Sequence, residues 1–196
     1  MSIRHTLSGL TYVGVCVVLS SILSPGVQGQ TAPALIEEMA GNWKVRQRMW
    51  PGSGAKPVDL PPAVAHRRLV EGAFLEEVME LEPGSSEKPF ARTAYFNFNA
   101  TNRQYEYFSL DSRLPQMMNE RSRKDRAGTE KGKIVLDGGR FIAPKWGNAT
   151  NVAFTYRLII GQVEKNTQVV QLYLTPQAGK SAKEFLAFEY DYTRQR

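Results

Sequence analysis

The chain has 196 residues, of which 42% are hydrophobic, and it carries a formal net charge of +6 and a single cysteine. This length fits one domain that can bury a self-sufficient core. One cysteine excludes a scaffold of internal disulfides, and the mild positive charge is explained by solubility alone.

Residues 1–29 have the pattern of a secretory signal peptide. Arg4 supplies the positive start, a 14-residue apolar run extends from Leu10 to Leu23, and Ser24-Pro25-Gly26 ends it. Val27-Gln28-Gly29 provides a cleavage site, so we expect export to the periplasm or the medium, with a mature chain starting near Gln30. The apolar run is shorter than the ~20 residues that span a bilayer, so no transmembrane segment is expected after cleavage.

Cleavage would remove the only cysteine, Cys16, which lies inside the apolar run. Disulfides, thiolate catalysis and cysteine-ligated metals are therefore not expected in the mature chain. The loss of Arg4 would leave 24 basic and 19 acidic side chains. The sequence carries no signal that sets an oligomeric state.

A short helix is predicted near Ala34–Met39, within a lead-in over residues 30–40. After it, apolar side chains alternate at period two, which indicates half-buried strands. A proline-studded loop runs from Pro51 to Pro62, and Asp137-Gly138-Gly139 is a strong tight-turn signal. The predicted strands are Asn42–Trp50, Ala63–Val70, Ala73–Leu81, Phe90–Phe98, Gln104–Leu110, Gln116–Lys124, Lys133–Asp137, Arg140–Lys145, Asn151–Ile160, Gln168–Leu174 and Glu184–Tyr192.

These segments predict an all-β domain over residues 41–196. No helix-sized segment separates neighbouring strands, and parallel pairing needs crossovers of a dozen residues or more. We therefore expect a single antiparallel up-and-down barrel of about ten strands, lipocalin-like, because closure removes the two edges of an open sheet. A sandwich of two sheets remains the alternative.

Alternation also predicts which side chains face the interior. Inward stripes are expected along three strands and at the closed end of the barrel. They comprise Phe154, Tyr156, Leu158 and Ile160; Val170, Leu172 and Leu174; Leu186, Phe188, Tyr190 and Tyr192; and Trp43, Val45, Gln47 and Met49. Tyr105, Tyr107 and Ser109 compete with Phe108 and Leu110 for the interior, and the pattern does not rank the two sets.

Several segments, taken in order, resemble a family of small bacterial lipocalin-like proteins. They are Gly41-Asn42-Trp43, Met49 to Gly54, Arg68 to Leu75, Phe98-Asn99 with Thr101, Tyr105 and Asp111, and Glu189 to Arg194. The family is catalogued as domain of unknown function fifteen-seventy-nine. The resemblance covers nearly all of the mature chain and implies a calycin-type barrel, with no established activity.

No cofactor or metal site is predicted. His66, the only histidine of the mature chain, could serve as a haem ligand, but the polar run His66-Arg67-Arg68 favours a surface position. A zinc site needs three or four ligands.

Two further patterns carry charge. One carboxylate of Glu76-Glu77 should point inward, where it could act as a general acid or base. Pairing with an arginine such as Arg68 or Arg46 is the commoner role.

A basic stretch contains Arg121, Arg123, Lys124, Arg126, Lys131 and Lys133. Interspersed acids, the absence of an aromatic platform and the export signal argue against nucleic-acid binding.

The tyrosines are the most suggestive feature, because an apolar ring with a polar tip suits a cavity for an amphipathic molecule. The candidate ligand-binding residues are Trp43, Arg68, Tyr105, Tyr107, Tyr156 and Tyr190. The leading hypothesis is a non-enzymatic binding protein for a small apolar or amphipathic ligand. The alternatives are an enzyme using Glu76 or Glu77 and an envelope module that binds a partner through its outer face.

Overall fold

The computed structural model describes residues 34–122, 129–130, 133–177 and 183–196. The predicted export signal, residues 1–29, lies outside the described residues, as do residues 30–33 of the lead-in and most of the basic stretch. In the part of the chain that is described, no helix has both the length and the hydropathy needed to span a membrane.

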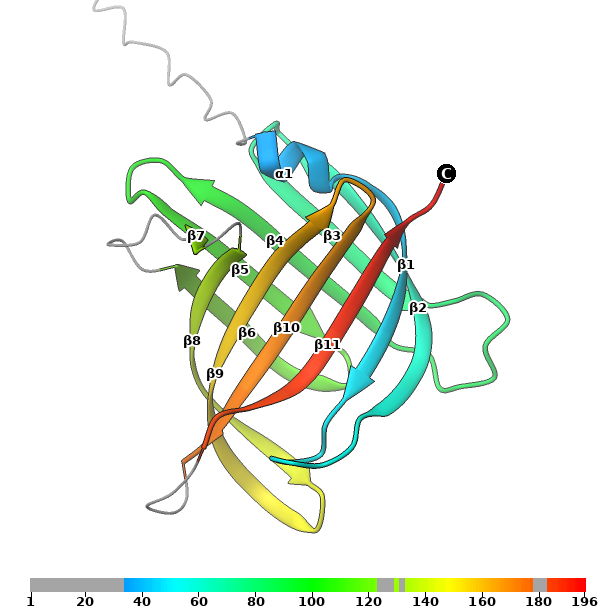
Figure 1. The fold of residues 1–196 in the computed structure, drawn as a ribbon, viewed down its shortest axis with the longest axis vertical. Coiled ribbons are helices and arrows are strands. Elements are labelled where there is room, and N and C mark those ends of the chain that lie inside the picture. Colours follow the sequence, from blue (N-terminus) through cyan, green and yellow to red (C-terminus); the bar gives the residue numbers. More distant parts are fainter. Residues whose placement is uncertain (1–33, 123–128, 131–132, 178–182) are drawn as a thin grey trace, which may run out of the picture.

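A short helix, α1 (Ala34–Met39), precedes a series of strands that form one antiparallel sheet (Figure 1). The strands are β1 (Gly41–Met49), β2 (Val58–Val70), β3 (Phe74–Leu81), β4 (Ala91–Asn99), β5 (Gln104–Asp111), β6 (Leu114–Ser122), β7 (Thr129–Glu130), β8 (Lys133–Trp146), β9 (Ala149–Glu164), β10 (Thr167–Pro176) and β11 (Phe185–Arg194).

The sheet closes into a ten-stranded barrel, which confirms the predicted fold class. The strand order runs from β6 through β1 to β11 and on to β8, and pairing between β6 and β8 joins the two ends. The two-residue strand β7 adds to β8. Closure leaves no long open edge, which is how an up-and-down barrel avoids pairing with other chains.

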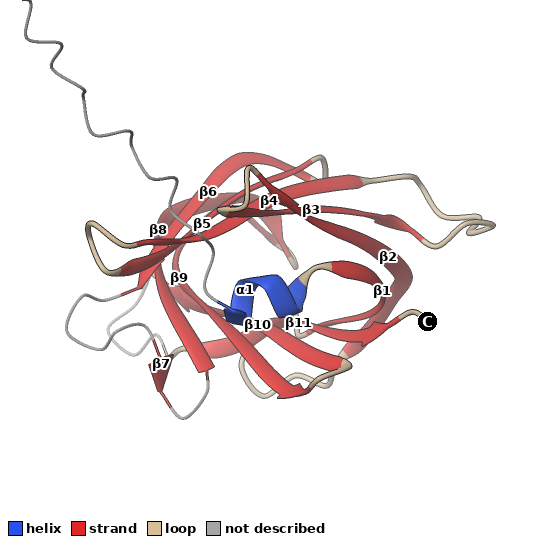
Figure 2. Ribbon diagram, turned by 90° about the horizontal axis from the view of Figure 1, so that it is seen from above, coloured by secondary structure: helices blue, strands red, loops and turns tan. Residues whose placement is uncertain are grey.

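Helix α1 lies across one mouth of the barrel (Figure 2). Its Ile36 and Met39 are buried, and the indole Nε1 of Trp43 donates a hydrogen bond to the Met39 carbonyl oxygen at 3.1 Å. Trp43 is fully buried, as expected for the closed end. This hydrogen bond satisfies one carbonyl at the end of the helix and fixes α1 to β1.

One predicted turn is wrong. Asp137-Gly138-Gly139 does not end a strand, because β8 continues from Lys133 to Trp146 with a register shift between Asp137 and Arg140. A Cβ on Gly138 would lie 2.0 Å from a ring carbon of Tyr156. Glycine is therefore needed because the Tyr156 ring packs directly on the backbone at this bulge.

The predicted loop before Ala63 is also partly wrong, because β2 begins at Val58 and includes Pro61 and Pro62. Proline is tolerated there because the β1–β2 register shifts between Val45 and Gln47, so the ladder is already interrupted. The side chain of Gln47 donates to the Pro61 carbonyl oxygen at 2.7 Å. This bond replaces a ladder hydrogen bond at the bulge.

The pairing between β6 and β8 is the shortest in the closed barrel. Among the described residues it comprises three pairs, Glu120–Gly138, Arg121–Asp137 and Ser122–Leu136. The ladder does not continue between residues 114–119 and 139–146, where the Gln116 side chain instead donates to the Ile142 carbonyl oxygen at 2.6 Å. We call the whole contact between β6 and β8, with its three residue pairs and the stretch without a ladder, the β6–β8 seam.

The interior contains two apolar clusters. The α1-end cluster includes Ile36, Met39, Trp43, Leu75, Met79, Phe96, Tyr105, Leu158, Ile160, Val170, Tyr190 and Tyr192. The far-end cluster consists of Phe141, Ala143, Phe154, Tyr156, Leu174 and Ala187. Leu172 and Phe188 pack against both clusters, so they mark the level of the barrel at which the clusters meet.

Candidate functional site

Five of the six predicted ligand-binding side chains face the interior. Trp43, Tyr105 and Tyr190 belong to the α1-end cluster, Tyr107 packs against it, and Tyr156 belongs to the far-end cluster. The competition on β5 is thereby resolved, since the strand turns Tyr105, Tyr107 and Ser109 inward and leaves Leu110 42% exposed. Because these rings belong to two different clusters, they do not all line one cavity.

Arg68, the sixth residue, lies on the outside of the barrel, and this corrects its predicted place in the interior. Its side chain is 74% exposed and contacts Glu76, whose other oxygen accepts a hydrogen bond from the Tyr95 hydroxyl at 2.8 Å. Tyr95 and Arg68 lower the pKa of Glu76 through these bonds. Arg68, Glu76 and Tyr95 form an outer cluster that does not reach the interior.

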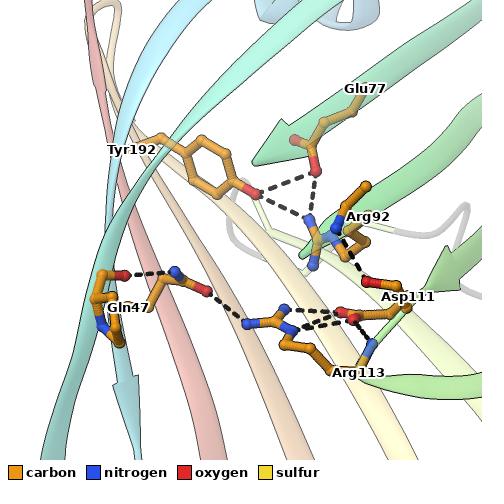
Figure 3. A network of polar contacts seen from close by, with 9 residues as sticks. Gln47, Glu77, Arg92, Asp111, Arg113 and Tyr192 are labelled. Atoms are coloured by element: carbon orange, nitrogen blue, oxygen red, sulfur yellow. Dashed lines mark hydrogen bonds and ion pairs between the residues drawn. The ribbon is translucent and has the colours of Figure 1, made fainter. Parts of the chain in front are cut away.

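Glu77 is the inward member of the acidic pair and is 5% exposed. Its carboxylate accepts hydrogen bonds from Arg67 Nε at 2.6 Å and from Arg92 Nη2. Arg92 Nη2 also donates to the Tyr192 hydroxyl oxygen at 3.1 Å (Figure 3). Arg67 donates to Gln168. Glu77 therefore pairs with Arg67 and Arg92 rather than with Arg68 or Arg46.

Aromatic rings hold these two arginines in place. The guanidinium of Arg67 lies 4.0 Å from the centroid of the Tyr192 ring, and that of Arg92 lies 4.9 Å from the centroid of Tyr190. Burial alone would raise the pKa of Glu77, but the charges of Arg67 and Arg92 lower it to about 2. Glu77 is thus ionised at any physiological pH, and its hydrogen bonds are those of a structural ion network.

Glu120, on β6, is a second buried carboxyl and is only 1% exposed. It pairs across the ladder with Tyr107 and, at the β6–β8 seam, with Gly138. Its hydrogen-bond partner is Tyr156, and its Oε2 atom has no partner among the described residues. Burial raises the pKa of Glu120 to about 8, although the Tyr156 hydrogen bond and the charge of Arg92 act in the opposite direction. The carboxyl is therefore mainly protonated at pH 7.

The Nε atom of Arg92 is also buried and without a partner among the described residues. Arg92 belongs to the wall of a cavity of about 20 Å³, together with Arg67, Glu77, Tyr107 and Tyr192. A space of this size has room for about one water molecule. This space by itself is therefore too small to hold a whole ligand.

Three apolar side chains in the middle of the barrel are only partly buried. Met118, Leu172 and Phe188 contact the interior clusters, yet all three keep part of their surface accessible. Leu172 lies on β10 between the hydrogen-bonded strands β9 and β11, and its neighbours on the inward stripe, Val170 and Leu174, are buried. Its accessible surface therefore faces the inside of the barrel, at the level where the two clusters meet.

A second polar group crosses the interior nearer the far end. Arg113, from the β5–β6 turn, donates to the side-chain oxygen of the fully buried Gln47 at 3.2 Å and to the Asp111 carboxylate at 2.7 Å (Figure 3). Its guanidinium also lies 3.7 Å from the centroid of the Phe90 ring. The charges of Arg113 and Asp111 compensate each other, so this group contributes no net charge to the interior.

Among the described residues, no three His, Cys, Asp or Glu side chains are grouped so that they could hold a metal ion. His66 is exposed, and its Nδ1 lies 2.8 Å from the side-chain oxygen of Asn42. The arrangement of groups in the interior suits the binding of a polar group by arginine, tyrosine and a protonated carboxyl.

Sequence reasoning missed three interior residues, Arg67, Arg92 and Glu120. A signal for Arg67 was present, because alternation from the small residues Ala63 and Ala65 places it inward. Arg92 shares the phase of Ala94 and Phe96, which is a similar signal. Glu120 had none, since polar residues occupy both faces of its strand.

Comparisons with known proteins agree with this architecture. The S-type phycobiliprotein lyase CPES from Guillardia theta has a similar structure, with a TM-score of 0.50 and 12% identity over 83% of this chain and 92% of that chain. Rv2717c from M. tuberculosis gives a TM-score of 0.52 and 16% identity over 85% of this chain and all of that chain. At these identities the likeness concerns the fold alone. No curated protein sequence matches the chain.

The family comparison is more specific, because it covers residues 29–194 and so includes every described strand. It confirms the resemblance that the ordered segments indicated. The chain belongs to the family described as protein of unknown function (DUF1579), and it is a lipocalin-like barrel.

Proposed function

We propose that this chain is an exported, non-enzymatic binding protein that holds a small amphipathic molecule inside its barrel. One observation carries the proposal: the interior contains both buried polar atoms without partners and apolar side chains that keep part of their surface accessible. These are Arg92 Nε and Glu120 Oε2 on one side, and the side chains of Met118, Leu172 and Phe188 on the other. Unpartnered buried polar groups are costly, so a bound molecule that gave these two atoms partners would be stabilised.

Export rests on residues 1–29, whose apolar run and cleavage site are those of a signal peptide. An envelope or extracellular location would bring the barrel into contact with lipids and other amphipathic molecules. The location is tested by determining the N-terminus of the protein purified from its own host. A start near Gln30 supports export, whereas an intact residue 1 opposes it.

The fold does not separate a binding protein from an enzyme, since one structural neighbour is named a phycobiliprotein lyase. The two carboxylates first considered for catalysis offer little support for an enzyme. Glu76 belongs to the outer cluster, and Glu77, with a pKa of about 2, is a poor proton acceptor at neutral pH. A binding role therefore accounts better for the interior.

Native mass spectrometry tests the proposal on protein purified from its host without denaturation. We expect an additional mass that is released on unfolding. After the endogenous ligand has been removed, the neutral fluorescent probe N-phenyl-1-naphthylamine should bind and gain fluorescence. A protein that carries no additional mass and takes up no probe would contradict the proposal.

Two adjacent methionines provide a matched pair of variants for the probe experiment. Met118 contacts the far-end cluster, whereas Met117 is 77% exposed on the outer face. Met118→Trp should fill the accessible interior and weaken probe binding at least about tenfold, or ~1.4 kcal/mol. Met117→Trp should leave probe binding unchanged. Equal effects of the two variants would place the probe outside the barrel.

A further inference from the structure

We propose that the polar end of the bound molecule is a singly charged anion, such as a carboxylate, and that Arg92 binds it. This inference rests on the proposed function and assigns the chemical class of the ligand. The ligand would then be an anionic amphipathic molecule, with its charged end near Arg92 and its apolar body against Met118, Leu172 and Phe188.

The first argument is the balance of charge in the interior. Around the cavity at the α1 end, the two cations Arg67 and Arg92 face one ionised carboxylate, Glu77. Arg113 and Asp111 pair with each other nearer the far end. Glu120 adds no negative charge while it is protonated. One buried positive charge therefore lacks a counterion, and an unpaired buried charge is strongly unfavourable unless an anion joins it.

The second argument is the geometry of Arg92. The side chain is only 7% exposed, and its Nη2 atom is already used by Glu77 and Tyr192. Its Nε atom is buried and has no partner among the described residues. The ring of Tyr190, 4.9 Å away, holds the guanidinium in one orientation. A fixed guanidinium with a free N–H is a preorganised donor for a carboxylate oxygen.

The third argument is the set of polar groups around Glu120. Glu120 faces Tyr156 from β9, Tyr107 from β5 and the charge of Arg92 from β4, with Gly138 of β8 across the seam. In its protonated form Glu120 has an O–H that donates a hydrogen bond, as do the tyrosine hydroxyls. Arg92 and protonated Glu120 can therefore each donate a hydrogen bond, which complements an anion and not a cation.

The experiment compares two probes of the same chain length, dodecanoate and dodecanol, in competition with N-phenyl-1-naphthylamine at pH 6.5. We expect dodecanoate to bind at least about tenfold more tightly, a difference of ~1.4 kcal/mol. If dodecanol binds as well as dodecanoate, the inference is wrong while the proposed function stands. If neither probe binds and no endogenous ligand is found, the proposed function fails as well.

Two variants test whether Arg92 causes the preference for dodecanoate over dodecanol. Arg92→Gln should abolish the preference for dodecanoate without weakening dodecanol binding, whereas Glu76→Gln in the outer cluster should change neither. An Arg92→Gln protein that folds, as judged by circular dichroism, and keeps the preference would overturn the assignment of Arg92.

A measurement of pH dependence remains decisive if Arg92→Gln does not fold. Between pH 7 and pH 9 the affinity for dodecanoate should fall, because ionised Glu120 would repel the carboxylate, while the affinity for dodecanol should stay constant. In Glu120→Gln the fall should be absent. An affinity for dodecanoate that is flat in the unmodified protein, or that falls equally in Glu120→Gln, would contradict the inference.

Discussion

Two buried carboxyls, Glu77 on β3 and Glu120 on β6, belong to the interior of the same barrel and differ in almost everything except burial. They are 5% and 1% exposed, yet the pKa of Glu77 is about 2 and that of Glu120 is about 8. Glu77 has two arginines within hydrogen-bonding distance, whereas Glu120 has one tyrosine. Partners, and not burial, therefore decide the charge of a carboxyl in this interior.

The strand pairing around Glu77 also differs from the strand pairing around Glu120. Glu77 lies on β3, where eight residue pairs join it to β2 and six to β4. Glu120 lies at the β6–β8 seam, where the described ladder comprises three pairs. The continuous side of the barrel contains the Glu77 ion network, in which Arg92 Nε lacks a partner among the described residues, and the seam contains Glu120, whose Oε2 also lacks one. We therefore expect Glu77 to act mainly in stability, and the two unpartnered groups, Arg92 and Glu120, to be the better candidates for function.

The largest expected effect is the loss of the ion network. Glu77→Gln would leave Arg67 and Arg92 buried without a counterion, and we expect it to lower the free energy of unfolding by about 3–5 kcal/mol. Urea denaturation measures the change, and Glu76→Gln, at the adjacent outward position, should have a much smaller effect. Similar effects of the two substitutions would mean that Glu77 is no more important than its exposed neighbour.

Substitutions at two adjacent glycines, Gly138 and Gly139, test the packing at the β6–β8 seam. A Cβ at Gly138 would overlap the Tyr156 ring, whereas a Cβ at Gly139 would meet no atom within 4 Å. We expect Gly138→Ala to reduce stability by about 1–3 kcal/mol, because the ring must move. Gly139→Ala should be nearly neutral. Near-ultraviolet circular dichroism would report the displaced tyrosine, and a silent Gly138→Ala would contradict the observed packing.

The two carboxyls should give opposite dependences of stability on pH. The pKa of Glu120 is raised on folding, so its contribution is fully present below pH 4.5 and is lost as the pH rises toward 8. The pKa of Glu77 is lowered, so its contribution is present above pH 4.5 and is lost as the pH falls toward 2.

Glu120→Gln should remove the loss of stability that the ionisation of Glu120 causes as the pH rises toward 8. Relative to the unmodified protein, its free energy of unfolding should increase between pH 4.5 and pH 8 by on the order of 1 kcal/mol per pH unit. Thermal or urea unfolding at several pH values provides the measurement. A difference that does not vary with pH would show that Glu120 ionises normally in the folded protein.

The smallest effect is expected outside the barrel. Arg68→Ala removes an exposed partner of Glu76 and should change the free energy of unfolding by less than about 1 kcal/mol. It should leave probe binding unchanged. A loss of binding in this variant would restore Arg68 to the site that the sequence first suggested.

Much of the fold could be predicted from sequence because strand alternation is a local property. The stripe that contains Tyr156 was placed inward correctly, as were Phe188, Tyr190 and Tyr192. Leu186 was not, because a register shift on β10–β11 brings Phe185 and Ala187 into the far-end cluster in its place. The turn at Gly138-Gly139 was mistaken because a glycine pair serves equally in a hairpin and in a bulge, and only the Tyr156 ring distinguishes the two.

The candidate site was harder to predict because it depends on partners that are distant in sequence. Arg67 and Arg68 are adjacent and chemically identical, so one step in the phase of β2 decides which of them enters the interior. The properties of Glu120 arise from Tyr156 and Arg92 on other strands. Such contacts follow from the closure of the barrel and not from any local pattern.

A crystal structure of the protein saturated with dodecanoate tests the central claim most directly. We predict that the carboxylate contacts Arg92 Nε and that the alkyl chain lies between the two apolar clusters, against Leu172 and Phe188. Side chains packed continuously through this level, with dodecanoate absent or bound only outside the barrel, would contradict it.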